Sequence, residues 1–176
     1  MLHAWLQQHA PQINWWCPQL PPSPRAAWEL MRDGTRGWPL RSMAVLGSSL
    51  GGFYATVVAE ALGCPAVVLN PAIDPARDLA RYVGDQTAYH DASQHFEFKA
   101  TYVDELRALT PPHITDPSRY AAVIAKGDEL LDWREMSQRY AGSHMRLLDG
   151  SDHALSDFDR HLPFVLAFLQ LRPHTV

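Results

Sequence analysis

Residues 43–63 read MAVLGSSLGGFYATVVAEALG, and this stretch is the most informative part of the sequence. MAVLG is a short apolar run typical of a buried strand, and residues 50–62 form a helix-like run. Gly63 follows that run as a favourable C-cap. Between strand and helix, Gly47-Ser48-Ser49-Leu50-Gly51 matches G-x-S-x-G, the pattern of a serine on a sharp strand-to-helix turn.

The rest of the chain alternates short apolar runs with longer amphipathic ones. Further strand candidates are residues 13–17 (INWWC), 66–69 (AVVL), 120–125 (YAAVIA) and 145–148 (MRLL). Helix candidates are a segment with Ser23 as N-cap and Pro24 at its first position, residues 132–140, and a C-terminal helix starting at Pro163 after a short turn. This alternation predicts an α/β fold with a mainly parallel sheet and helices on both faces.

The composition excludes several classes of protein. The chain has 176 residues, of which 47% are hydrophobic, and this apolar content argues against disorder. A net charge of −4 gives no sign of nucleic-acid binding. Cys17 and Cys64 match no metal or redox spacing, so we expect a reducing compartment, no metal and no other cofactor. With neither a signal-peptide pattern nor a membrane-length apolar run, the sequence predicts a cytoplasmic protein without a membrane span.

One segment departs from the alternating pattern. Residues 74–116 are polar and rich in Tyr, His, Asp and Arg, with weak helix signals around 77–82 and 102–109. We expect a single domain over residues 1–176, in which residues 74–116 form a lid-like insertion over one end of the sheet. Four aromatic residues of the insertion are candidates either for an acyl pocket or for simple packing: Tyr82, Tyr89, Phe96 and Phe98.

The serine motif predicts nucleophilic catalysis by Ser49. A serine nucleophile needs a base, and the base needs an orienting carboxylate, in the chain order Ser, Asp or Glu, His for this kind of turn. Asp128 follows the strand candidate YAAVIA, and His153 follows MRLL. Both come just after strands, at the sheet edge where ligands bind in open α/β sheets. The helix N-terminus and the Leu50 N–H would face the developing oxyanion.

Alternatives exist for each of these roles. Glu129 is the nearest rival to Asp128, and Asp132 is a candidate N-cap for the helix at residue 133. His144 and His161 are alternatives to His153 that lack its position after a strand. The glycine-rich turn could also be purely structural, whereas a phosphate-binding loop is set aside because no Lys follows the glycines.

Several stretches together resemble one family. They are GSSLGGFYAT (47–56), LNPA (69–72), GDELLDWREM (127–136) and GSDHALSDFDRHLPFVLAFL (150–169). These stretches are similar to the small bacterial YqiA-type esterases of the α/β-hydrolase superfamily. The resemblance implies hydrolysis of esters or thioesters through an acyl-enzyme, with Ser49 as nucleophile, His153 as base and Asp128 as orienting acid.

The beginning of the chain departs from the family pattern. Family members open with a strand that ends in a Leu-His-Gly-Phe loop, which contributes a second oxyanion N–H. Here MLHAWL already matches the helix after that loop, and the sequence contains no His-Gly pair. We therefore expect the first family strand to be absent and Met1 to be an internal methionine. The strand at 43–47 should then either lack a neighbour on one side or pair directly with the strand at 13–16.

These observations predict a cofactor-free serine hydrolase acting on a small-molecule ester or thioester. Two alternatives remain open: a non-catalytic binding domain of the same fold, and an acyltransferase using the same three residues.

Overall fold

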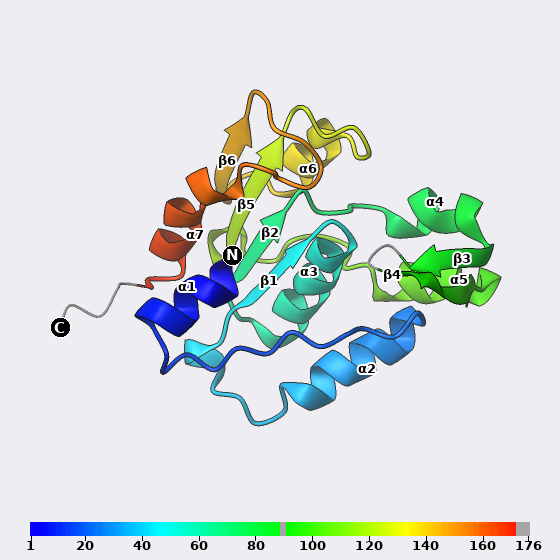
Figure 1. Cartoon of the computed structure of the whole chain (residues 1–176), viewed down its shortest axis with the longest axis horizontal. Helices are drawn as coiled ribbons and strands as arrows, with labels where there is room; N and C mark the ends of the chain where they lie inside the picture. The colour runs from blue at the N-terminus through cyan, green and yellow to red at the C-terminus, as the bar shows by residue number, and fades with distance from the viewer. Residues whose placement is uncertain (89–90, 172–176) are drawn as a thin grey trace.

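The computed structural model describes residues 1–88 and 91–171, and its centre is a four-stranded sheet in which every pair is parallel (Figure 1). The strand order is β1-β2-β5-β6. The strands are β1 (Val45–Ser48), β2 (Ala66–Leu69), β5 (Tyr120–Ala125) and β6 (His144–Leu148). The predicted parallel sheet is confirmed, and these four strands match the sequence expectations to within two residues at each end.

The two central strands are buried on both faces, which is why they read as continuous apolar runs. Alternate residues of each strand enter different cores. Ala66 and Val68 of β2 pack into one core, and Val67 and Leu69 pack into the other. This alternation follows from the two-residue period of a strand.

Helices cover both of these faces, as predicted (Figure 1). The helices on the first face are α2 (Pro24–Gly34), α3 (Leu50–Leu62) and α6 (Trp133–Arg139). On the second face lie α1 (Leu2–His9) and α7 (Leu162–Phe168), whose apolar residues pack together and against Leu46 of β1. No helix in the described ranges has both the length and the apolar content needed to cross a membrane.

The helix boundaries follow the capping signals. Ser23 Oγ accepts a hydrogen bond from the Ala26 N–H at 3.2 Å, and Asp132 Oδ1 accepts one from the Arg134 N–H at 2.9 Å. Helix α3 ends at Gly63, whose φ of +75° is the left-handed conformation that glycine adopts without strain. Single 3₁₀ turns occur at Leu40–Ser42, Ala80–Tyr82, Pro117–Arg119 and Phe158–Arg160.

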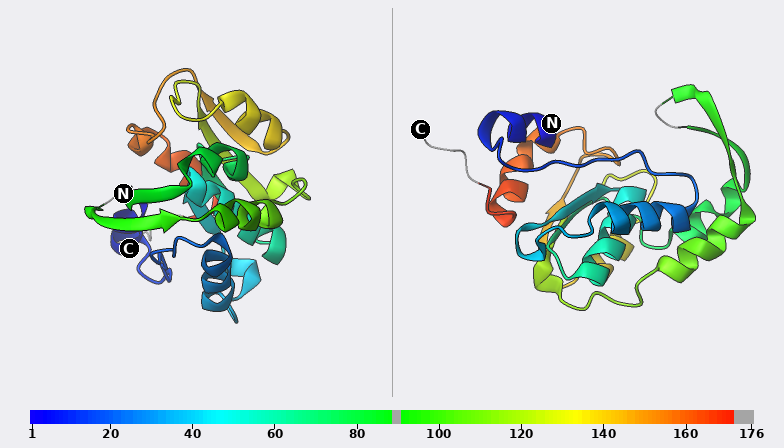
Figure 2. Two further views of the ribbon diagram at one scale, coloured as in Figure 1. Left: turned by 90° about the vertical axis from the view of Figure 1, so that its right-hand side faces the viewer. Right: turned by 90° about the horizontal axis from the view of Figure 1, so that it is seen from below.

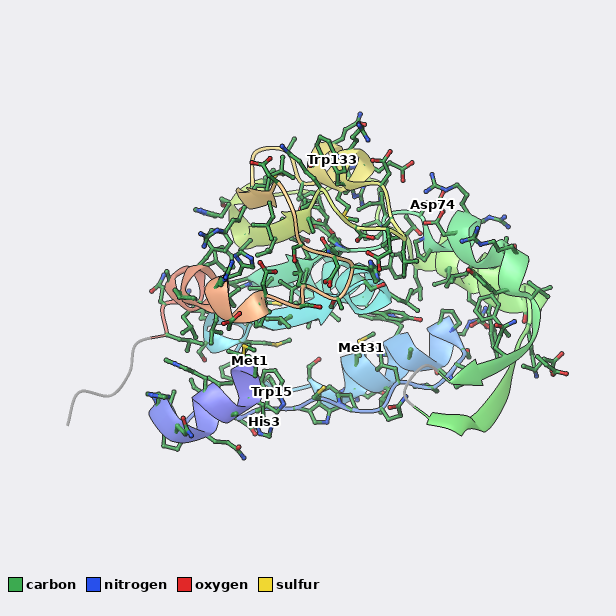
Figure 3. The ribbon with its side chains drawn as sticks, turned by 45° about the horizontal axis from the view of Figure 1, so that its top comes forward. Met1, His3, Trp15, Met31, Asp74 and Trp133 are labelled. Atoms are coloured by element: carbon green, nitrogen blue, oxygen red, sulfur yellow. The ribbon has the colours of Figure 1, made fainter. Side chains whose placement is uncertain are left out.

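The strand predicted at residues 13–17 is not formed, and that prediction was wrong. Trp15 instead stacks on His3 of α1, with ring centroids 5.5 Å apart (Figure 3). The ring of Trp16 lies against α2 at Gly34, so closely that a Cβ on Gly34 would come within 2.3 Å of Trp16 Cη2. Within the described ranges β1 pairs only with β2, so it lacks a neighbour on its other side as expected, and the alternative of direct pairing with residues 13–16 is wrong.

The segment 74–116 contains a β-hairpin that the sequence did not predict. Its elements are α4 (Pro75–Leu79), β3 (Gly84–Ala88), β4 (Asp91–Phe98) and α5 (Ala100–Leu109). The two helices agree with the weak helix signals, whereas the hairpin sequence is polar and lacks an apolar alternation. The hairpin projects away from the sheet and its helices (Figure 2). Helix α5 is tied to α2 because the Glu105 carboxylate accepts hydrogen bonds from Ser23 Oγ at 2.8 Å and the Arg25 N–H at 3.0 Å.

Candidate active site

Ser49 stands on the turn between β1 and α3 in a conformation that L-residues rarely adopt. Its φ is +54° and its ψ is −123°, a strained combination for a residue with a side chain. Backbone hydrogen bonds hold it there. The Ser49 N–H donates to the Leu69 carbonyl at 3.0 Å, and the Ser49 carbonyl accepts from the Ala72 N–H at 3.0 Å. The end of β2 therefore supports the strained turn.

Two glycines make room for this turn. A Cβ on Gly47 would lie 2.0 Å from the Gly51 carbonyl oxygen, and a Cβ on Gly52 would lie 2.7 Å from Pro71 Cβ. A Cβ on Gly51 would meet no atom within 4 Å. There is therefore room for a side chain at Gly51, the second glycine of the G-x-S-x-G pattern. At Gly47 and Gly52 there is no such room.

The structure brings Ser49, His153 and Asp128 into one chain of hydrogen bonds. His153 Nε2 lies 2.9 Å from Ser49 Oγ, and His153 Nδ1 lies 2.8 Å from Asp128 Oδ2. An ionised carboxylate only accepts, so Nδ1–H donates to Asp128 and Nε2 accepts the proton of the Ser49 hydroxyl. This arrangement leaves the imidazole able to take a proton from the serine.

Asp128 is fixed by its own loop. Its second oxygen, Oδ1, accepts hydrogen bonds from the Leu130 N–H at 2.8 Å and the Leu131 N–H at 2.9 Å. Its side chain is 0% exposed, whereas that of His153 is 16% exposed. The carboxylate is therefore shielded from water, while the imidazole stays accessible from the site.

The alternative candidates have other partners. Glu129 accepts a hydrogen bond from the backbone N–H of His153 at 3.0 Å, so it contacts the histidine loop and not the imidazole. Asp132 caps α6, as expected. His161 lies 3.2 Å from Asp157, and His144 packs beside Phe168. Of these histidines, only His153 lies within hydrogen-bonding distance of Ser49 in the described ranges.

Leu50, the residue that the sequence suggested for an oxyanion role, directly follows Ser49. Leu50 is the first residue of α3, a 13-residue helix whose N-terminus carries partial positive charge. Its N–H makes no hydrogen bond with any residue that the structure describes. An N–H at this position can donate a hydrogen bond to an oxyanion that develops beside the serine.

Acidic side chains hold the loop that carries His153. Asp152 accepts hydrogen bonds from the hydroxyl and the N–H of Ser156 at 2.6 and 2.9 Å, which lower the pKa of its carboxyl group. Asp157 accepts from the Ser151 hydroxyl, and this hydrogen bond likewise lowers the pKa of Asp157. Both carboxyl groups are therefore charged at neutral pH, on either side of the histidine.

Asn70 was not singled out by the sequence analysis. It follows β2 directly and is fully buried, and its side chain contacts the loop of His153. The available signal was a polar residue at the end of an apolar strand run.

Of the aromatic residues proposed for an acyl pocket, Phe98 is buried and packs edge-on against Tyr102, and Tyr82 is exposed. Tyr89 and the side chain of Phe96 lie outside the described residues.

No cluster of three or more His, Cys, Asp or Glu side chains suited to a metal ion occurs in the part of the chain that the structure describes. Cys17 is exposed and Cys64 is buried, and neither is in a disulfide.

Residues 1–170 match the model of a family described as "Uncharacterised protein family (UPF0227)". The chain belongs to this family. UPF0227 is the YqiA-like family, so the resemblance seen in the sequence is confirmed.

Solved structures similar to this UPF0227 member are α/β hydrolases. A candidate hydrolase from Agrobacterium vitis S4 is 16% identical, with a TM-score of 0.64 over 84% of this chain and 69% of that one. An α/β superfamily hydrolase from Oenococcus oeni PSU-1 is 15% identical, with a TM-score of 0.55 over 87% and 77%. The esterase domain of a Rhodothermus marinus protein is 18% identical, with a TM-score of 0.53 over 84% and 65%. At such identities the likeness shows the fold, which is that of the α/β hydrolases.

Proposed function

We propose that this protein is a serine hydrolase that cleaves carboxylic esters or thioesters through an acyl-enzyme intermediate. The observation that carries the proposal is the chain of hydrogen bonds from Ser49 through His153 to Asp128. The strained turn at Ser49 adds to this support, as does the Leu50 N–H, which has no partner in the described part of the chain. The fold is shared with an esterase domain, which is consistent with ester substrates.

The geometry permits a complete acyl-transfer cycle. Ser49 Oγ attacks the substrate carbonyl carbon while His153 Nε2 takes the hydroxyl proton, and the Leu50 N–H donates to the resulting oxyanion. Asp128 stabilises the imidazolium without taking its proton. The imidazolium then protonates the leaving alcohol or thiol, which leaves an ester on Ser49. Water, deprotonated by His153, releases the carboxylic acid and restores the serine.

The segment 74–116 is proposed as a cover for this site within a single domain. Arg77 and Asp78 of α4 line a cavity of about 50 Å³ together with Pro71 and Leu131. Leu131 is one of the residues whose N–H binds Asp128, so the insertion borders the loop of the orienting acid. The cavity lies between α4 and the residues that lead into α6.

Labelling with a fluorophosphonate and hydrolysis of p-nitrophenyl acetate test the function. The unsubstituted protein should label and turn over, and Ser49→Ala should do neither. Ser48→Ala is the matched control, because Ser48 lies one residue earlier in β1 and makes no hydrogen bond to His153 in the described ranges. Equal turnover by Ser49→Ala and the unsubstituted protein would refute the assignment. Failure of the unsubstituted protein to label would favour a non-catalytic domain.

A further inference from the structure

Asn70 occupies a junction between the strands that lead to the proposed catalytic residues. It directly follows β2, which lies between β1 and β5 in the sheet (Figure 1). The residue is 0% exposed, and its φ is +40°. Its own N–H donates to the Val123 carbonyl of β5 at 3.0 Å. Its backbone is therefore held against the strand that leads to Asp128.

The side-chain amide of Asn70 makes three further hydrogen bonds. Oδ1 accepts from the Ala125 N–H at 2.8 Å, and Nδ2 donates to the carbonyls of Asp152 at 2.9 Å and His153 at 3.1 Å. The neighbours fix the orientation of the amide, because exchanging its oxygen and nitrogen would point the oxygen at two carbonyls and the nitrogen at an N–H.

These three bonds connect the two proposed members of the site that lie on different loops. Ala125 ends β5, and Asp128 follows three residues later. The other two bonds end on the backbone of His153 and of the residue before it. A single buried side chain thus spans the start of the Asp128 loop and the backbone that carries the imidazole.

We propose that Asn70 is a positioning residue that sets the placement of His153 relative to Asp128 and Ser49. The expected effect on kcat rests on the proposed function. Asn70 contacts no reacting atom, so it acts through the histidine backbone.

Asparagine fits this position better than its isosteres. Asp lacks the donors that the two carbonyls require, and Leu lacks both donors and acceptor. A positive φ also favours asparagine among residues with side chains. Asparagine therefore meets both requirements of this position, which are a positive φ and a side chain that accepts one hydrogen bond and donates two.

The test uses Asn70→Asp, which keeps an acceptor for the Ala125 N–H and removes both donors to the His153 loop. Asn70→Ala is measured in the same way, so that poor folding of one variant does not decide the outcome. The matched control is Tyr120→Phe, which removes a partly buried hydrogen bond to Glu60 at the opposite end of β5. Fluorophosphonate titration counts the competent sites, and kcat is expressed per titrated site.

We expect kcat per site to fall by about 10²-fold in the Asn70 variants with a much smaller change in KM, because small misplacements of a catalytic group cost rate. Tyr120→Phe should keep its kcat per site even if its melting temperature falls. A purely structural role would reduce the number of titrated sites and leave kcat per site unchanged. A kcat per site within about twofold of the unsubstituted protein would overturn the inference.

A second readout does not depend on hydrolysis. The Nδ1 proton shared by His153 and Asp128 should give a downfield proton NMR resonance, identified by its loss in Asp128→Ala. The resonance should disappear or broaden in both Asn70 variants and persist in Tyr120→Phe. Its persistence in the Asn70 variants would also overturn the inference. If the unsubstituted protein neither labels nor turns over, the proposed function fails, and the resonance alone decides the positioning role.

Discussion

Replacing Asp128 by Asn should remove most of the activity while leaving the fold intact. The carboxylate has two separate tasks in the structure. Oδ1 accepts the N–H groups of Leu130 and Leu131, and Oδ2 accepts the proton on His153 Nδ1. An asparagine must keep its oxygen toward the two N–H groups, so its NH₂ group takes the position of Oδ2.

This placement changes the tautomer of the His153 imidazole. An NH₂ group facing Nδ1 requires Nδ1 to accept, which moves the imidazole proton to Nε2. Nε2 lies 2.9 Å from Ser49 Oγ and would then carry a hydrogen where the base needs a lone pair. The same exchange in a serine-protease triad lowers kcat by about 10⁴, and we expect a loss of that order here. The loop should survive, because the oxygen that accepts the two N–H groups is retained.

The assay is kcat on p-nitrophenyl acetate, measured beside the melting temperature. Glu129→Gln is the matched control on the adjacent residue, because glutamine can still accept the His153 N–H through its side-chain oxygen. We expect less than about a tenfold loss of kcat for this control. Asp128→Ala should lose both activity and stability, because it leaves two loop N–H groups without their acceptor.

A larger loss of kcat for Glu129→Gln than for Asp128→Asn would refute the reasoning and assign the orienting role to Glu129. A loss below about tenfold for Asp128→Asn would refute the tautomer argument itself.

Three further predictions concern stability. Gly47→Ala should fold poorly, because its Cβ would lie 2.0 Å from a carbonyl oxygen, whereas Gly51→Ala, with no atom within 4 Å of its Cβ, should melt close to the unsubstituted protein in calorimetry. Ser23→Ala should lower the free energy of unfolding in urea by about 0.5–2 kcal/mol, because it removes both the N-cap of α2 and the hydrogen bond from Ser23 Oγ to Glu105, and equal stability would contradict both roles. The pKa of Asp157 is lower in the folded than in the unfolded protein. Its carboxylate therefore contributes fully to the free energy of unfolding above about pH 4, and this contribution is lost as the pH falls through the folded pKa. Asp157→Asn should therefore lose less stability between pH 5 and pH 2 than the unsubstituted protein.

Two features of the fold did not follow from the apolar pattern of the sequence. Residues 13–17 have the apolar content of a strand, but a strand also needs a hydrogen-bonding neighbour, and their rings pack on α1 and α2 instead. The hairpin of β3 and β4 shows the reverse case. Its sequence is polar and lacks an apolar alternation, yet its two strands pair with each other.

Most of the helices and sheet strands, and the candidates for the site, could be predicted from the sequence. Ser23, Gly63 and Asp132 mark helix ends because caps act on backbone groups within a few residues. The strands β2 and β5 were visible because burial on both faces leaves an unbroken apolar run. Ser49, Asp128 and His153 could be nominated because each comes within five residues of the end of a predicted strand, and the carboxyl ends of parallel strands share one edge of the sheet.

The choice between neighbouring candidates and the long-range contacts depended on the packed fold. Asp128 and Glu129 are adjacent and chemically alike, and which carboxylate meets the imidazole depends on the paths of two loops 25 residues apart. The contacts of Asn70 join groups up to 83 residues away. Hydrogen bonds require their atoms to lie within a few tenths of an ångström of an ideal distance, and that precision arises only when the sheet and both of its cores are packed.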